Sequence, residues 1–172
     1  KEAAWDLDAG RLALSADSRY LAATDRGGVI HTWDVESGKE FRSFDAEPGN
    51  VKALTFSPDG RYLIAGTGRR FSVGSNGPAP PRANTVRIWE LASGLAVLVL
   101  DRPEASVLYV AYSPDGRTFA SGSGNGAVRL WEAASGKELL CRDDEGNKPL
   151  CLAFSPDCSS LASGMNDGTA LL

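Results

Sequence analysis

Apolar and polar residues alternate along this chain in short runs, and each run ends at a turn signal. Residues 107–112 form an apolar, β-prone run, and residues 127–131 alternate between the two kinds. Between them, residues 113–116 read Ser-Pro-Asp-Gly, in which proline presets φ, aspartate bonds nearby backbone and glycine accepts a positive φ. Residues 125–126 are Asn-Gly, a strong hairpin signal. The pattern predicts short antiparallel strands joined by tight turns, and no stretch shows a convincing helical period.

The same pattern recurs four times. The copies are SADSRYLA at 15–22, SPDGRYLI at 57–64, SPDGRTFA at 113–120 and SPDCSSLA at 155–162. A step of 24 residues separates each of Trp33, Trp89 and Trp131 from the serine that opens the next copy, and the full period is 42. A fixed period of this size is typical of stacked supersecondary units that cannot bury their apolar faces alone. Each unit is predicted to be a four-stranded antiparallel meander.

The repeats resemble WD40 repeats, the blades of a β-propeller. The residues that carry the resemblance are SPDG at 57–60 and 113–116, VRIWE at 86–90, VRLWE at 128–132, and Trp33-Asp34. The resemblance implies an all-β fold of propeller blades, each a four-stranded antiparallel meander. The periodic tryptophans Trp33, Trp89 and Trp131 are expected to pack between blades, and the aspartates Asp59, Asp115 and Asp157 to hold the repeated turns.

The repeats also depart from the family pattern. The family often carries Gly-His before the first strand of a blade, and the three corresponding pairs here begin with aspartate and contain no histidine. The sequence therefore does not predict the family's network of histidine, serine or threonine, and tryptophan. The single histidine, His31, aligns with Arg87 and Arg129. It is expected to be a half-exposed strand residue with no acid or nucleophile partner fixed by spacing.

The repeat register divides the chain into blades. It predicts a partial blade at 1–8, blades at 9–50, 51–106 and 107–148, and a truncated blade at 149–172. It also places the next tryptophan at position 173, one residue beyond Leu172, and the chain begins with Lys1 rather than methionine. We therefore expect a fragment that forms an open arc of an incomplete propeller. The alternative is a small natural module with a worn last repeat.

Composition excludes some classes of protein. The formal charge of −4 over 172 residues argues against general affinity for nucleic acid, and no apolar run approaches the length of a membrane span. The three cysteines, Cys141, Cys151 and Cys158, fit neither a zinc site nor paired disulfides. They predict free thiols in a reducing compartment, and hence a cytoplasmic location. Because Cys158 replaces the turn glycine, its turn should be strained or of another type.

No catalytic constellation, cofactor site or metal site is predicted, so the favoured function is a non-catalytic protein-interaction scaffold. The second blade supplies the candidate binding segment, since 32 residues rather than 18 separate Ser57 from Trp89. The 14 extra residues fall within 69–84, between the second and third strands, and this segment has no acidic residue. Its candidate partner-binding residues are Arg69, Arg70, Phe71 and Arg82. They would suit an acidic or phosphorylated protein, or the segment is a tolerated surface insertion.

Two other functions stay open at this stage. The blades could be a sensor attached to a catalytic domain, such as a kinase or protease, outside this chain. They could also hold a small molecule or peptide at the central channel of the propeller. Neither alternative is supported by a specific residue, because fold alone does not give function.

Overall fold

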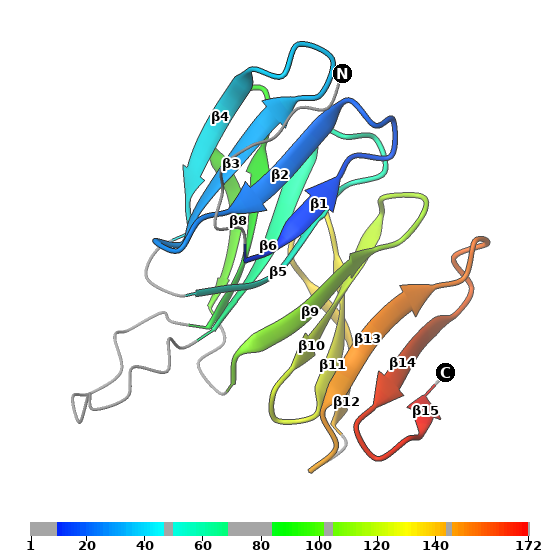
Figure 1. The fold of residues 1–172 in the computed structure, drawn as a ribbon. Coiled ribbons are helices and arrows are strands. Elements are labelled where there is room, and N and C mark those ends of the chain that lie inside the picture. The colour runs from blue at the N-terminus through cyan, green and yellow to red at the C-terminus, as the bar shows by residue number, and fades with distance from the viewer. Residues whose placement is uncertain (1–9, 47–49, 69–83, 102–104, 144–145, 172) are drawn as a thin grey trace, which may run out of the picture.

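The structure is a computed structural model that describes residues 10–46, 50–68, 84–101, 105–143 and 146–171. These residues form fifteen strands in four antiparallel sheets and no helix (Figure 1). The first sheet contains β1 (Leu12–Leu14), β2 (Tyr20–Thr24), β3 (Val29–Asp34) and β4 (Glu40–Asp45). The second contains β5 (Asn50–Phe56), β6 (Tyr62–Gly68), β7 (Thr85–Glu90) and β8 (Ala96–Asp101). The third contains β9 (Val107–Tyr112), β10 (Thr118–Ser123), β11 (Ala127–Glu132) and β12 (Glu138–Asp143). The last contains β13 (Pro149–Phe154), β14 (Leu161–Met165) and β15 (Ala170–Leu171).

Each sheet is a meander in which consecutive strands are neighbours. We call the sheets blades 1 to 4. The first strands of successive blades lie side by side, because β1 contacts β5, β5 contacts β9, and β9 contacts β13. The blades fan outward from this row and do not close on themselves (Figure 1). The all-β prediction, with antiparallel meanders in an open arc, is therefore confirmed.

The strands that open the blades differ slightly from the prediction. β5, β9 and β13 begin within one residue of the predicted blade starts at 51, 107 and 149. The first strand was expected from residue 9, which lies outside the described residues, and β1 begins only at Leu12. Just before it, the Arg11 amide donates to the hydroxyl of Thr24 at 2.9 Å instead of to a strand carbonyl. Backbone pairing also continues there, because the Gly10 amide donates to the Thr24 carbonyl and the Thr24 amide donates to the Arg11 carbonyl, both at 3.0 Å.

The repeated turns explain why each blade folds locally. Gly60 and Gly116 take positive φ values of 69° and 70°, and each amide donates back to the serine that opens the turn. Cys158 occupies the same place with a φ of 62°, and its amide donates to the Ser155 carbonyl at 3.0 Å. Cys158 therefore forms the same type of turn as the glycines do, and its backbone is strained. A non-glycine residue in this region costs on the order of 1 kcal/mol or more.

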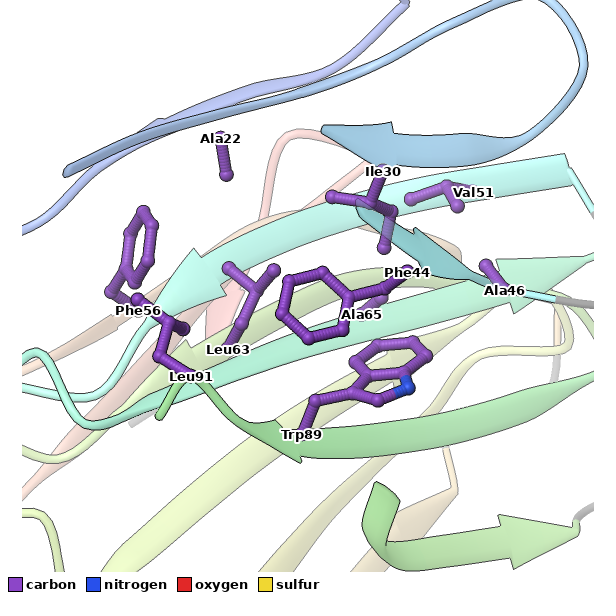
Figure 2. Close-up of a cluster of buried hydrophobic side chains, with 10 residues drawn as sticks. All are labelled: Ala22, Ile30, Phe44, Ala46, Val51, Phe56, Leu63, Ala65, Trp89 and Leu91. Carbon is purple, nitrogen blue, oxygen red and sulfur yellow. The ribbon is translucent and has the colours of Figure 1, made fainter. Parts of the chain in front are cut away.

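The core lies between blades rather than within them. Successive residues of a strand face opposite sides, so blades 2 and 3 each pack one face on the blade before and the other on the blade after. The first interface, between blades 1 and 2, holds ten buried apolar residues (Figure 2): Ala22, Ile30, Phe44, Ala46, Val51, Phe56, Leu63, Ala65, Trp89 and Leu91. The second interface, between blades 2 and 3, is built around Ile64, Val86, Ile88, Val107, Phe119 and Trp131.

Candidate interaction surfaces

The antiparallel meander gives the arc two rims. The turns between first and second strands and between third and fourth strands lie on one side, which we call the turn rim. The turns between second and third strands, and the segments that join blades, lie on the opposite side, which we call the loop rim. Each rim is built from backbone held by buried strands, so each can display side chains on a rigid base.

Aspartates hold the turns of the turn rim. Asp115 accepts the Ser113 hydroxyl at 2.6 Å and the Arg117 amide at 3.0 Å, and these bonds lower the pKa of its carboxyl group. Asp157 makes the equivalent bonds with Ser155 and Ser159, which lower its pKa to about 2. At Asp59, burial acts to raise the pKa, but the bond from Ser57 and the backbone bonds outweigh it. The structure thus places Asp59, Asp115 and Asp157 in the repeated turns, where each ionised carboxylate accepts the hydrogen bonds that hold the turn.

The periodic tryptophans lie within the stack of blades. Trp33, Trp89 and Trp131 are 6%, 4% and 1% exposed. In blade 3, the Trp131 indole Nε1 donates to the Ser121 hydroxyl at 2.8 Å, a buried bond between neighbouring strands. Blade 2 carries Ala65 at the position of Ser121. The serine–tryptophan part of the family's network is therefore present in blade 3, even though the sequence did not predict such a network.

His31 has acidic neighbours that sequence spacing did not indicate. Its Nδ1 lies 2.8 Å from Glu40 Oε1, and its ring stacks on Trp33 with centroids 5.8 Å apart. Glu40 is nine residues away in sequence but lies on the adjacent strand β4. Strand pairing therefore gives His31 an acidic partner that spacing along the sequence did not identify. His31 itself is half-buried.

The residues equivalent to His31 and Glu40 form an ion pair in blade 3, and one of the two is replaced in blade 2. Arg129 Nε lies 3.6 Å from Glu138 of β12. In blade 2 the cation is Arg87, but alanine occupies the place of the glutamate. The Nε of Arg87 is buried and has no hydrogen-bond partner. Blade 2 has therefore lost a polar contact that its neighbours keep.

On the loop rim, the inserted segment leaves blade 2 from a rigid base. β6 ends at Gly68 and β7 begins at Thr85. Thr67 and Thr85 are both fully buried, and the Thr85 amide donates to the Thr67 hydroxyl at 2.9 Å. The two hydroxyl oxygens also lie 2.9 Å apart. The candidate residues Arg69, Arg70, Phe71 and Arg82 lie outside the residues that the structure describes.

On the turn rim, side chains of blade 1 fill the edge of the first interface. The Phe41 ring lies 5.3 Å from the ring of Tyr20. Beside it, Arg42 reaches across to blade 2 and donates to the carbonyl of Ala92 at 2.9 Å and to that of Ser93 at 3.3 Å. Arg42 thus joins blade 1 to blade 2 by two charge-assisted hydrogen bonds, and Phe41, which is 43% exposed, packs beside it on Tyr20 of its own blade.

The matching edge of the second interface is hollow. The positions of Phe41 and Arg42 are taken by Val97 and Leu98, which line a groove of about 570 Å³. Its other walls are formed by Tyr62 and Ile88 of blade 2 and by blade 3 residues that include Tyr112, Asp115 and Ala134. We call this space the rim groove. Sequence reasoning missed it, although aligning EFRSFD at 40–45 with AVLVLD at 96–101 shows the smaller residues.

Tyr112 and Asp59 give the rim groove a polar wall. Burial raises the pKa of the Tyr112 hydroxyl, and the nearby Asp59 carboxylate raises it further, so the phenol stays neutral. Asp59 and Asp115 line the groove from the two blades. The surface therefore combines apolar side chains, two tyrosines and two carboxylates.

A second groove, of about 640 Å³, lies between blades 3 and 4 and is lined by residues that include Leu130, Leu140 and Phe154. Among the residues that the structure describes, no group of three or more histidine, cysteine, aspartate or glutamate side chains could hold a metal ion. Cys141 and Cys151 are exposed, Cys158 is half-buried, and all three are free thiols. Nor do the described residues form a helix that is long and apolar enough to cross a membrane.

Comparison with known proteins identifies the repeats. The family model described as "WD domain, G-beta repeat" matches residues 38–90, 95–132 and 141–172. The chain is similar to WD repeat-containing protein SL1-17 of Schistosoma mansoni, with 33% identity over 133 residues that cover 69% of this chain and 39% of that protein. It is also similar to small ribosomal subunit protein RACK1 of Schizosaccharomyces pombe, with 28% identity over 64% of this chain and 33% of that protein.

A third relative is transcription initiation factor TFIID subunit 5 of Caenorhabditis elegans, with 26% identity over 69% of this chain and 16% of that protein. The chain thus spans well under half the length of these curated relatives. Proteins built from WD40 propellers are generally non-enzymatic platforms for protein–protein interaction. The family model covers most of the chain in three repeats, so this chain belongs to the WD40 repeat family.

Proposed function

We propose that this chain is a non-catalytic scaffold that binds protein partners at the rims of its blades. The observation that carries the proposal is the insertion in blade 2, which departs from the 42-residue period and leaves from a buried base at Thr67 and Thr85. A rigid base limits the ordering cost of a binding segment to the segment itself. Two relatives bear names of assembly components, a ribosomal subunit protein and a TFIID subunit, which supports a scaffold role.

The finer proposal is that the inserted segment binds an acidic or phosphorylated protein. Residues 69–84 carry Arg69, Arg70 and Arg82 and no acidic residue, on a chain of net charge −4. Arginine offers a planar set of donors that matches carboxylate and phosphate groups, and Phe71 adds an apolar anchor beside it. We also propose a cytoplasmic location, which the three free cysteines support.

The test uses a degenerate peptide library with one fixed phosphoserine, immobilised and probed with residues 1–172. Replacing Arg69, Arg70 and Arg82 together by alanine should weaken binding at least tenfold, or about 1.4 kcal/mol. The effect should shrink as salt rises, because exposed charges are screened. Shortening the 69–84 segment by 14 residues should abolish binding and leave the thermal melt unchanged, since blade 3 joins the same strands by a short turn.

The matched control replaces Arg19, Arg61 and Arg117 by alanine. These three arginines are exposed and lie at the turn rim, on the opposite side of the blades from the insertion. Because three arginines are removed in each variant, the change in net charge is the same. Binding by this control should match the parent chain. Equal loss in both triple variants would reduce the effect to net charge, and unchanged binding after shortening would show that the segment plays no part.

A further inference from the structure

We propose that the rim groove between blades 2 and 3 binds an exposed segment of a partner protein that carries an aromatic residue followed by arginine. The chain itself supplies the template for this occupant. At the first interface, the corresponding place is filled by the chain's own Phe41 and Arg42. At the second interface, Val97 and Leu98 leave that place open as a groove of about 570 Å³.

The aromatic part of the proposed ligand follows from Tyr62. In blade 1, the matching tyrosine, Tyr20, packs against Phe41 with ring centroids 5.3 Å apart. In blade 2, Tyr62 lines the groove, and Val97 at the place of Phe41 is 53% exposed. An aromatic ring entering beside Tyr62 would bury both Val97 and the tyrosine face. Aromatic pairs of this kind contribute beyond the area they bury.

The arginine part follows from the turn of blade 3. Arg42 donates to the carbonyls of Ala92 and Ser93, in the turn between the third and fourth strands of blade 2. The matching carbonyls of blade 3 belong to Ala134, which lines the groove, and to Ser135 beside it. Leu98, at the place of Arg42, lies against Gly136 of this turn and carries no donor for them. A guanidinium from a partner could reach the same kind of acceptors.

Charge favours the same ligand. Asp59 and Asp115 line the groove, and the pKa of each carboxyl is held below its usual range by the turn hydrogen bonds. Both are therefore ionised at neutral pH. Two carboxylates at the mouth of an apolar groove attract a cation and repel an acidic segment. The turn rim would therefore bind a cationic segment and the loop rim an acidic one. The inference about the groove does not depend on the inserted segment.

The test titrates residues 1–172 with a defined peptide, acetyl-Gly-Gly-Phe-Arg-Ser-Gly-amide, which copies the sequence at residues 41–43 without the acidic residue before it. Saturable binding with a Kd below about 1 mM is expected by isothermal titration calorimetry. Peptides with alanine in place of phenylalanine, or alanine in place of arginine, should each bind at least about tenfold more weakly. No saturable binding, or equal binding of the three peptides, would overturn the proposal.

A filled-groove variant locates the site. Val97→Phe with Leu98→Arg installs the residues that blade 1 carries, and should reduce peptide binding at least about tenfold while the protein stays folded in a thermal melt. The matched control places the same pair on β13, as Leu150→Phe with Cys151→Arg, two exposed residues that do not line the groove, and should bind like the parent chain. Unchanged binding by the folded filled-groove variant would refute the groove as the site. The phosphoserine-library result is independent of both outcomes, so the two proposals fail separately.

Discussion

The two complete blade interfaces share a strand pattern but close differently at the turn rim. The first interface buries Phe44 and Trp89 with ring centroids 5.6 Å apart, and Arg42 ties blade 1 to the next turn of blade 2. The second encloses Trp131 beside Phe119 of its own blade, with centroids 6.2 Å apart, has Leu100 at the place of Phe44, and opens at its edge into the rim groove. Each interface therefore encloses a periodic tryptophan, but the side chains that the outer strand supplies differ.

The difference teaches where a repeat protein can vary. The tryptophan and the strand that faces it are enclosed by two blades, so a change there leaves a cavity or a clash. The outer strand buries Phe44 in the same way, but its residues near the turn rim, such as Phe41 and Val97, are largely exposed. Exchanging Phe41 and Arg42 for Val97 and Leu98 there removes volume and two hydrogen bonds but leaves the backbone register unchanged. Binding sites can therefore arise at outer strands without loss of the fold.

The largest expected effect separates Phe56 from Tyr112, which occupy the same place on β5 and β9. Phe56 is 6% exposed in the first interface, so Phe56→Ala should lower the free energy of unfolding by about 3–5 kcal/mol. Tyr112 faces the rim groove and is only half-buried, so Tyr112→Ala should cost roughly 1–2 kcal/mol. Urea unfolding of both variants measures the difference. Equal losses would mean that the two interfaces are equally well packed.

The next effect concerns Arg42. Arg42→Leu makes the first interface resemble the second and removes two charge-assisted hydrogen bonds, so it should cost about 1–2 kcal/mol. Leu98→Arg is the reverse exchange in the second interface, and should be neutral or stabilising if the new guanidinium reaches Ala134 and Ser135. Chemical denaturation compares the two. If both variants lower the free energy of unfolding by the same amount, Arg42 acts through packing alone.

A smaller effect distinguishes the two tryptophans. Trp131 donates to Ser121, whereas Ala65 stands at the matching position beside Trp89. Trp131→Phe should therefore cost about 1 kcal/mol more than Trp89→Phe, since it leaves the buried Ser121 hydroxyl without its donor. Adding Ser121→Ala to Trp131→Phe should recover part of that difference. Thermal melts of the three variants suffice, and identical losses in the two single variants would remove the hydrogen bond as a cause.

The sequence predicted the blades because each copy carries its own strand and turn signals. Residues 57–60 and 113–116 specify a turn with local hydrogen bonds and a positive φ, which needs no information from distant parts of the chain. The turn at Cys158 kept the same conformation without glycine, because pairing of β13 with β14 enforces it. Ser18 takes the same positive φ in the first copy, so local signals sufficed for the fold and tertiary context overrode the two missing glycines.

The candidate surfaces were less predictable. In the pairing of β7 with β8, the register shifts between Ile88 and Trp89. This irregularity interrupts the regular alternation of faces along β8. For this reason, the sequence alone does not show that Val97 and Leu98 both line the groove. The contact of His31 with Glu40 likewise depends on the pairing of β3 with β4. The inserted segment was evident from the period, and its four candidate residues stay predictions.

The smallest expected effect should be shared by both interfaces, because the same Ser–Asp turn recurs in every blade. Hydrogen bonds, first that from the serine hydroxyl, lower the pKa of Asp17 and of Asp115 in the folded state. The unfolded value is about 3.9. A carboxyl whose folded pKa is lowered binds fewer protons when folded, so its stabilising contribution is present above about pH 4 and is lost as the pH falls below it. Asp17→Asn and Asp115→Asn should each make the melting temperature fall less steeply between about pH 4 and pH 2, and by similar amounts. Calorimetric melts across that range measure the slopes, and a flattened slope in only one variant would mean that the turns, and not only the outer strands, differ between the interfaces.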